Sequence, residues 1–348
     1  MNCARRLSAI EKFLSEQNID CFFVTNEVNV SYLSGFRRSE SMLMLTRKGR
    51  FFITDFRYQE EAEASLEGFE LTLVDKSTYS TVAGLAGRLD LKTIGFESMD
   101  LPSGALTELR SAVSGAQFVP LKGTVESLRV IKDEGETALM KKAVKIAGSV
   151  YSKAVKKLGA PGMTEDRLRQ EIEASFINKG SRAAFCPIVA VGPNSSRPHA
   201  ASGKRKIGPN SVVLIDLGGV FSGYNSDLTR TTLLGRIPPE VERVYAIVEE
   251  ARRRAIANIR PGVKISDVDL AARRYIQERG YGKHFGHSLG HGIGMEVHEF
   301  PTISQHNDDL LAENMVFTVE PAIYVPGLCG IRIEDMILVT KAGCEVLS

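Results

Sequence analysis

The sequence predicts a protein of the mixed α/β (α+β) class with two domains. Its 348 residues exceed one average domain and suit two. Residues 1–125 alternate between helical and extended patterns, whereas residues 126–348 begin with a long amphipathic helix and carry one helix–turn–helix–strand pattern twice. With 43% hydrophobic and 25% charged residues, the chain can bury full cores without disulfide or metal crosslinks.

Residues 1–125 are expected to form an α/β domain of their own. Apolar residues recur at helical spacing from the start of the chain, so an opening helix is expected to end near Gln17. A hairpin is expected to turn at Lys48-Gly49, between two apolar, β-prone stretches. Helical stretches separate the later strands. The expected strands, in order, are DCFFVT, SMLMLT, RFFIT, FELTLV, TIGFE and AQFVP.

Residues 126–348 contain an internal repeat of one helix–turn–helix–strand unit. A helix that ends at a Pro-Gly turn (161–162) precedes a second helix, for which Thr164 is the expected N-cap. Later in the chain, a helix that ends at another Pro-Gly turn (261–262) precedes a helix for which Ser266 is the expected N-cap. Strand-like sequence follows each helix pair. Two copies of one unit predict a pseudo-two-fold duplication with a cleft where the halves meet.

Charge and cysteine content exclude several classes of protein. A net charge of +2 and a pI of about 8.2 are too balanced for a nucleic-acid partner. The five cysteines are scattered and include no Cys-x-x-Cys pair, which indicates a reducing compartment and no thiolate zinc site. The N-terminus has a helical pattern instead of a signal peptide, and no apolar stretch is long enough to span a membrane. We therefore expect a cytoplasmic protein.

Four acidic residues occur in or beside apolar, strand-like stretches of the second domain. Asp216 closes one such stretch and Asp227 begins the next, across a Gly-rich turn. Glu320 and Glu334 interrupt two further strand-like stretches. An ionised carboxylate in a buried strand is costly unless it is paired or bound to a cation. Either aspartate alone could be an ordinary turn residue. With Arg332 as the only nearby base, however, the four together predict a cation site.

The imidazole that such a site would need lies in HFGHSLGHGIGMEVHEFP. His287, His291 and His298 are separated there by glycines, which let the backbone approach a ligand closely. Three unrelated surface histidines remain the alternative. The same stretch contains GHSLG, the Gly-x-Ser-x-Gly pattern of serine hydrolases, with Ser288 as nucleophile. That pattern requires a helix after the serine, and the glycines that follow disfavour one. Carboxylates with one imidazole suit Mn²⁺, Co²⁺, Fe²⁺ or Zn²⁺.

One ordered series of motifs runs through the second domain: Asp216, Asp227, Gly-His291-Gly-Ile-Gly, His298-Glu299, Glu320-Pro and Ile-Glu334-Asp. This series resembles the pita-bread-fold metallopeptidases, most of all the Xaa-Pro peptidases, namely aminopeptidase P and prolidase. The resemblance implies a creatinase-type N-terminal α/β domain over residues 1–125. It also implies a pseudo-two-fold pita-bread catalytic domain over residues 126–348.

The resemblance further implies a site with two divalent metal ions, of which manganese is the first expectation and cobalt, zinc or iron are compatible. Asp227 and Glu334 would bridge both ions. The implied metal ligands are Asp216, Asp227, His291, Glu320 and Glu334. The implied catalytic residues are Glu320, His298 and His287. The residues expected to contact the substrate are His199, Phe185, Arg332 and Thr229. His284 and His306 match no functional position and are expected to be structural or exposed.

The expected activity is hydrolysis of the peptide bond before proline, by a metal-bridging hydroxide with Glu320 as general base. Methionine aminopeptidase activity and a non-catalytic binding module on the same fold are the alternatives. The expected partner is a proline-containing di- or oligopeptide, with neither nucleic acid nor membrane, and relatives are commonly homodimers. Arg37 and Arg38 either belong to a solvated charged loop, or one of them reaches the partner's site and pairs with a dipeptide's carboxylate. The second alternative favours a dipeptidase over an aminopeptidase P.

Overall fold

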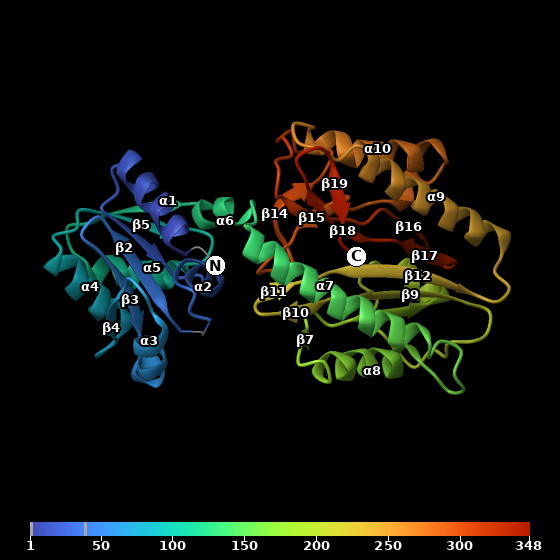
Figure 1. Cartoon of the computed structure of the whole chain (residues 1–348), viewed down its shortest axis with the longest axis horizontal. Coiled ribbons are helices and arrows are strands. Elements are labelled where there is room, and N and C mark those ends of the chain that lie inside the picture. The colour runs from blue at the N-terminus through green and yellow to red at the C-terminus, as the bar shows by residue number, and fades with distance from the viewer. Residues whose placement is uncertain (1–2, 38–39) are drawn as a thin grey trace. The chain divides into compact units, whose positions relative to one another are not determined.

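The computed structural model describes residues 3–37 and 40–348 and divides the chain into two compact units, Met1–Leu128 and Arg129–Ser348 (Figure 1). The domain boundary that the sequence places between residues 125 and 126 stays a prediction. Arg38 lies outside the described residues. None of the helices in the described part of the chain is long and apolar enough to cross a membrane.

The first unit is built on one six-stranded sheet with the order β4-β3-β2-β1-β5-β6. The hairpin expected across Lys48-Gly49 is present as the antiparallel pair β2–β3, whereas β5 lies parallel to β1 and β6. The strands are β1 (Cys21–Val24), β2 (Met42–Thr46), β3 (Gly49–Thr54), β4 (Glu70–Leu73), β5 (Thr93–Glu97) and β6 (Gln117–Leu121). The helices are α1 (Cys3–Glu16), α2 (Glu27–Ser34), η1 (Phe56–Tyr58), α3 (Gln59–Ser65), α4 (Thr78–Arg88), α5 (Ser103–Ala112) and α6 (Thr124–Arg129).

Helices pack on both faces of this sheet, which explains why its central strands read as continuous apolar runs. On one face Phe23 and Met44 pack with Leu85 of α4 and Leu109 of α5. Strand β5 ends in a buried carboxylate, that of Glu97. It accepts hydrogen bonds from the backbone N–H groups of Thr25 (2.6 Å) and Asn26 (2.7 Å), just before α2. Glu97 therefore fixes the start of α2 to the sheet.

The second unit contains two helix pairs, each packed against its own sheet. Helices α7 and α8 pack on the sheet β12-β9-β8, and α9 and α10 pack on the sheet β14-β13-β15-β18-β19. In Figure 1, α9 and α10 lie above β9 and β12, and α8 lies below them. The helices are α7 (Glu134–Val155), α8 (Glu165–Ile177), η2 (Gly192–Ser196), α9 (Pro239–Ala257), α10 (Ile265–Glu278) and η3 (Gly282–His284).

The strands of the second unit form four sheets, because two smaller ones, β11-β10-β7 and β16-β17, accompany the two main sheets. The strands before α9 are β7 (Arg182–Ala183), β8 (Ile188–Val191), β9 (Ser211–Leu217), β10 (Gly219–Phe221), β11 (Tyr224–Asn225) and β12 (Leu228–Leu234). Those after α10 are β13 (Gly290–Gly292), β14 (Glu299–Ile303), β15 (Val316–Val319), β16 (Ala322–Val325), β17 (Cys329–Arg332), β18 (Asp335–Val339) and β19 (Cys344–Val346).

The expected duplication is confirmed by matching backbone contacts in the two halves. Just before α8, Thr164 forms an isolated bridge with Lys206, and just before α10, Lys264 forms the equivalent bridge with Leu310. Thr164 is the N-cap of α8, as expected, and its side chain accepts from the third N–H of the helix. The expected cap at Ser266 is wrong. That residue lies inside the first turn of α10, where its hydroxyl donates to Asp308.

The start of the second unit is held by a buried cluster of charges. Arg129 donates to Glu296 (2.8 Å) and to Glu299, and the ammonium of Lys132 lies 3.4 Å from the other oxygen of Glu299. The side chains of Arg129, Lys132 and Glu299 are 3%, 1% and 4% exposed. Glu299 is the first residue of β14 and directly follows His298. The cluster therefore connects residues 129–132, at the start of the second unit, to the loop that carries His298.

Candidate metal centre

Among the residues that the structure describes, Asp227, His291 and Glu334 form a group that could hold a metal ion. One ligand atom from each of the three lies within 4.8 Å of the other two. Glu320 adjoins this group, since its Oε1 lies 3.4 Å from His291 Nε2. His291 Nε2 is also 3.8 Å from Asp227 Oδ2. Residues far apart in the sequence therefore meet at one point of the second unit.

Breaks in the β-structure position the two glutamates. Both were expected inside strands, but Glu320 lies between β15 and β16, and Glu334 lies between β17 and β18. At these breaks the hairpin passes from the five-stranded sheet, where β15 pairs with β18, to the separate pair β16–β17. The backbone N–H groups of the two glutamates bond outside the hairpin. The N–H of Glu320 donates to the carbonyl of Leu289 (2.8 Å), and the N–H of Glu334 donates to the carbonyl of Thr229 (3.0 Å). These bonds bring Glu320 to the strand of His291 and Glu334 to the strand that follows Asp227.

Asp216 joins the cluster through the register of β9 and β12, which places it opposite Thr229. One oxygen of Asp216 lies 2.5 Å from Nη2 of Arg332. Thr229 accepts from Nε of Arg332 (3.1 Å) and donates to Glu334 (2.7 Å). Arg332 and Thr229 therefore hold the carboxylates of Asp216 and Glu334 in place by hydrogen bonds. Arg332 itself is almost fully buried, at 5% exposure.

The carboxylates stand too close together to be ionised freely. Burial raises the pKa of Asp227 well above its usual range, and the negative charges of Glu334 and Asp216 raise it further. Burial, then the charges of Glu320 and Asp216, likewise raises the pKa of Glu334. For Glu320, burial raises the pKa to about 7, although Arg332 opposes the shift. Burial and the neighbouring His298 lower the pKa of His291 to about 4, so its ring is a neutral ligand group at pH 7.

These residues fit divalent metal ions. Asp216 Oδ1 and Asp227 Oδ1 are buried without a hydrogen-bond partner, as is expected of oxygens reserved for a cation. Four carboxylates with one imidazole form the oxygen-rich donor set that Mn²⁺, Co²⁺, Fe²⁺ and Zn²⁺ accept. Glycine is required on both sides of His291, since a Cβ on Gly290 would collide with the carbonyl of Thr318 and a Cβ on Gly292 with that of Phe300.

His287 lies apart from the carboxylates and is joined to a tyrosine that the sequence did not suggest. Its Nδ1 lies 2.7 Å from the carbonyl oxygen of Ser288, and its Nε2 lies 3.3 Å from the hydroxyl of Tyr324. The same hydroxyl accepts from Arg332 Nη1 at 2.7 Å, so it is free to donate its proton to His287. Burial lowers the pKa of His287 to about 4, which keeps its ring neutral. Tyr324 therefore links the buried Arg332 to this histidine.

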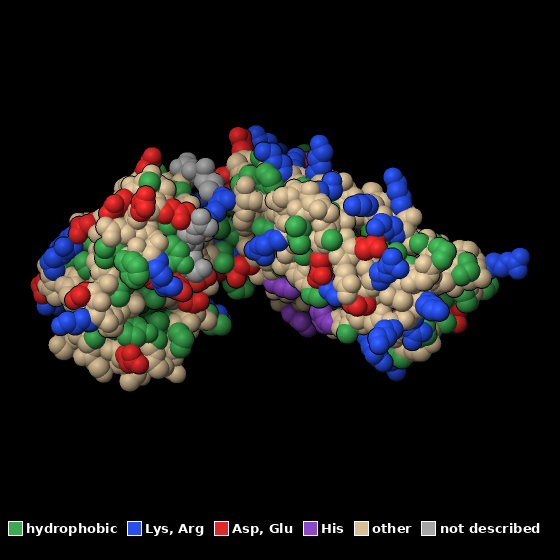
Figure 2. All heavy atoms as spheres, turned by 90° about the horizontal axis from the view of Figure 1, so that it is seen from below, with side chains coloured by type: hydrophobic (Ala, Val, Ile, Leu, Met, Phe, Trp, Pro, Cys, Tyr) green, Lys and Arg blue, Asp and Glu red, His purple; other side chains and the backbone are tan. Residues whose placement is uncertain are grey.

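The other predicted residues lie at different distances from the carboxylates. The ring of His298 is exposed and its centroid lies 4.3 Å from that of His291. His199 is exposed and lies near enough to His287 to contribute to the lowered pKa of that ring, after burial and the nearby arginines. Figure 2 shows histidine side chains gathered at one place on the surface of the second unit. The half-buried ring of Phe185 lies against Gly218, just after β9.

The two histidines without an assigned role behave differently. Nδ1 of His284 lies 2.9 Å from the backbone carbonyl of Tyr324, so this half-buried ring is structural. His306 is exposed and contacts the neighbouring Gln305 side chain. Both arrangements agree with the expectation for these two residues.

The geometry of a serine nucleophile elbow is absent from the GHSLG segment. Ser288 follows a stretch without regular structure, and the residues after it form the short strand β13 instead of a helix. A nucleophile elbow needs a strand before the serine and a helix after it. The serine hydrolase alternative therefore has no structural support.

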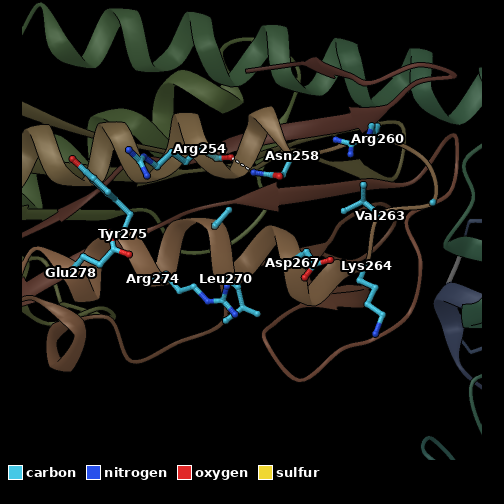
Figure 3. Close-up of a pocket in the computed structure, with 12 residues that line it drawn as sticks. Arg254, Asn258, Arg260, Val263, Lys264, Asp267, Leu270, Arg274, Tyr275 and Glu278 are labelled. Carbon is cyan, nitrogen blue, oxygen red and sulfur yellow. Dashed lines mark hydrogen bonds between the residues drawn. The ribbon is translucent and has the colours of Figure 1, made fainter.

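A separate hollow of about 680 Å³ lies along α9 and α10 (Figure 3). Figure 3 shows that its charged side chains come from both helices and from the turn between them. Arg254, Arg260 and Lys264 line it, together with Asp267 and Glu278. It contains none of the predicted site residues, so it is distinct from the carboxylate cluster.

Comparison with known proteins identifies the family. Residues 138–341 match Metallopeptidase family M24, and residues 6–131 match the Creatinase/Prolidase N-terminal domain. The chain is 33% identical over 353 residues to the Xaa-Pro dipeptidase of Pyrococcus horikoshii, covering 99% of this chain and 96% of the relative. A solved Xaa-Pro dipeptidase from Bacillus anthracis shares 35% identity with a TM-score of 0.96, covering 99% and 97% of the two chains. An X-Pro aminopeptidase from Thermotoga maritima shares 36% identity with a TM-score of 0.88, covering 96% and 97%.

The fold and the carboxylate-rich site therefore define a metal-dependent peptidase. The chain belongs to metallopeptidase family M24, with a creatinase-type N-terminal domain before a pita-bread catalytic domain. The family and the fold class expected from the motif series are confirmed. The family also establishes a dependence on divalent metal ions.

Proposed function

We propose that this peptidase hydrolyses the peptide bond before proline in dipeptides, as an Xaa-Pro dipeptidase with two divalent metal ions, of which manganese is the first expectation. The observation that carries the proposal is the convergence of Asp227, His291 and Glu334 within 4.8 Å, beside Glu320 and Asp216. Activity before proline is named for the Xaa-Pro dipeptidases of Pyrococcus horikoshii and Bacillus anthracis and for the X-Pro aminopeptidase of Thermotoga maritima, which supports the substrate class.

In this proposal five side chains would hold the two ions: Asp227 and Glu334 would serve both, Asp216 would bind one, and His291 with Glu320 would bind the other. The chemistry that divalent ions supply at such a site is polarisation of the scissile carbonyl and a lower pKa of the attacking water. Among the protein's own groups, Glu320 accepts the proton of that water and later donates it to the departing proline nitrogen. Glu320 is placed for this role because its Oε1 lies 3.4 Å from Nε2 of His291, beside the other carboxylates of the cluster.

The remaining side chains are proposed to bind the substrate. A bond to proline has no N–H, so the enzyme must recognise the shape of the ring. The exposed His199 and the half-buried Phe185 are proposed to line the proline pocket. His298, exposed beside His291, is proposed to stabilise the negative charge that develops on the carbonyl oxygen. The proposed role of His287 is to orient this part of the site through its contact with Tyr324.

A cleavage panel tests the proposal. The peptides Ala-Pro, Ala-Pro-Ala and Met-Ala-Ala would each be incubated with the purified full-length chain and Mn²⁺, Co²⁺ or Zn²⁺. We expect Ala-Pro to be cleaved fastest, with Mn²⁺ as the best activator and complete loss of activity in EDTA. Preferred cleavage of Met-Ala-Ala would refute specificity for proline and favour a methionine aminopeptidase. Activity that survives EDTA but not a serine-directed fluorophosphonate would refute the metal assignment.

The preference for dipeptides is proposed to depend on Arg37, an exposed residue of the first unit that could bind the free carboxylate of a dipeptide in a partner's site. Arg37→Ala should lower kcat/KM for Ala-Pro selectively, and the tripeptide Ala-Pro-Ala is the internal control. An equal effect on both peptides would exclude this role. That the enzyme is a cytoplasmic homodimer stays a prediction, which size-exclusion chromatography with light scattering would test for the dimer.

A further inference from the structure

Helix α10 carries a buried ion pair. Arg273 lies one turn after Asp269, to which its Nε (2.6 Å) and Nη2 (2.9 Å) both donate. The side chains are 0% exposed for Asp269 and 17% for Arg273, whereas the pair Arg254–Glu250 of α9, with the same spacing, leaves 48% and 23% exposed. Burying an ion pair is unfavourable unless its other donors and acceptors are satisfied. The buried Asp269–Arg273 pair therefore needs further hydrogen-bond partners.

The additional partners are backbone groups of residues 285–289. Arg273 donates from Nη1 to the carbonyl of Phe285 (3.1 Å) and from Nη2 to the carbonyl of His287 (2.7 Å). The N–H of Leu289 donates to Asp269 Oδ2 (3.0 Å). Bonds at every second residue along one edge are the way a strand pairs with its neighbour. Two side chains of a helix take the place of that neighbouring strand here, directly before β13.

This segment carries His287 and contacts the backbone of Glu320. The carbonyl of Leu289 accepts the N–H of Glu320 at 2.8 Å. The ring of Phe285 lies 4.3 Å from the guanidinium of Arg273 and meets the ring of His287 edge to face at 5.1 Å. His287 is therefore held through its own carbonyl and through the ring of Phe285, and the backbone of Glu320 is held through Leu289.

We infer that the Asp269–Arg273 pair is a positioning device that sets His287 and Glu320 for peptide hydrolysis. The inference rests on the proposed function of those two residues. Because the pair acts through the backbone of residues 285–289, Asp269 and Arg273 are positioning residues. A misplacement of a catalytic group by about 1 Å lowers the rate on the order of 10²-fold, which sets the size of the expected effect.

Three substitutions on α10 test the inference. Arg273→Met removes every hydrogen-bond donor of the side chain, and Arg273→Lys keeps the positive charge but not the planar guanidinium that donates to several acceptors at once. Arg274→Met is the matched control at the exposed neighbouring position. With Ala-Pro and Mn²⁺, Arg273→Met should lose about 10²-fold in kcat, with KM and bound metal close to the wild type. Arg273→Lys should lose less, and Arg274→Met should match the wild type.

A second measurement does not need activity. Isotope-labelled histidine would give NMR signals from the ring nitrogens of His287, assigned by their loss in His287→Gln. These signals should shift in Arg273→Met and stay unchanged in Arg274→Met. Wild-type kcat with unshifted signals in Arg273→Met would overturn the inference, and so would a loss of activity that only follows a loss of folded protein. Shifted signals in a protein that cleaves no proline peptide would refute the proposed function and leave the positioning intact.

Discussion

Replacing Glu299 by Gln should destabilise the second unit strongly, because it leaves two buried cations without their shared carboxylate. Arg129 and Lys132 are 3% and 1% exposed, and Glu299 is 4% exposed. Removing one member of a buried ion pair costs about 3–5 kcal/mol. Glutamine keeps a hydrogen bond and Glu296 still pairs with Arg129, so we expect the lower end, about 3 kcal/mol. For a unit of this size that loss lowers Tm by about 6–12 °C.

The assay is calorimetry of the full-length chain with Mn²⁺ present, in which the transition of the second unit is followed. Glu345→Gln is the matched control, since Glu345 pairs with Lys141 on the surface, where both side chains are 46% exposed. A surface pair of this kind contributes about 0–1 kcal/mol, so the control should barely move the transition. Equal shifts of Tm in Glu299→Gln and Glu345→Gln would refute the argument from burial.

Other substitutions separate metal binding, chemistry and folding. Asp227→Ala and Glu334→Ala should each lose bound metal, measured by atomic emission, together with activity, because in the proposed site each of these carboxylates would serve both ions. His287→Ala and His298→Ala should keep their metal but lose about 10²–10³-fold in kcat, as is typical when one positioning or oxyanion contact is removed. Glu97→Gln should abolish a pH-dependent loss of stability in the first unit, measured by urea unfolding between pH 4 and 8. Burial raises the pKa of Glu97 to about 7, so the folded chain keeps a proton that the unfolded chain releases. Stability should therefore fall by about 3 kcal/mol as pH rises from about 4.3 to 7 in the wild type.

Each of these expectations has an outcome that contradicts it. Full kcat with two bound metal ions in Asp227→Ala or Glu334→Ala would remove that residue from the ligand set. A folded but metal-free His287→Ala or His298→Ala would make the histidine a ligand. If Glu97→Gln kept the wild-type pH dependence of unfolding, the proton uptake would have to occur at another group.

The carboxylates were predictable because each one stands out against its surroundings. Asp216 occurs at the end of an apolar strand and Glu320 between two apolar stretches, so each demands an explanation in the sequence alone. Tyr324 carried no such signal, since a tyrosine in AIYV suits an ordinary buried strand equally well. The register of β16 and β17 brings its hydroxyl to Arg332, and register depends on contacts far apart in the chain.

Local patterns also failed where a long-range bond decided the structure. Ser266 resembled a helix cap, but α10 begins at Ile265, and the serine hydroxyl bonds to Asp308. Glu334 was expected inside a strand, yet its N–H bonds to Thr229 and breaks the pairing there. Asp269 and Arg273 have the spacing of an ordinary surface ion pair on a helix. Their burial becomes evident only when residues 285–289 are placed against them.

The C-terminal strand has a consequence for the handling of this protein. β19 pairs with β18 through Cys344 opposite Val339, and the last residue, Ser348, accepts from the N–H of Met336. All five residues of β18 are buried. A chain clipped before Cys344 would leave the backbone groups of this apolar strand open along one edge, and open edges recruit strands from other molecules. Proteolytic clipping near the C-terminus should therefore show first as aggregation on storage.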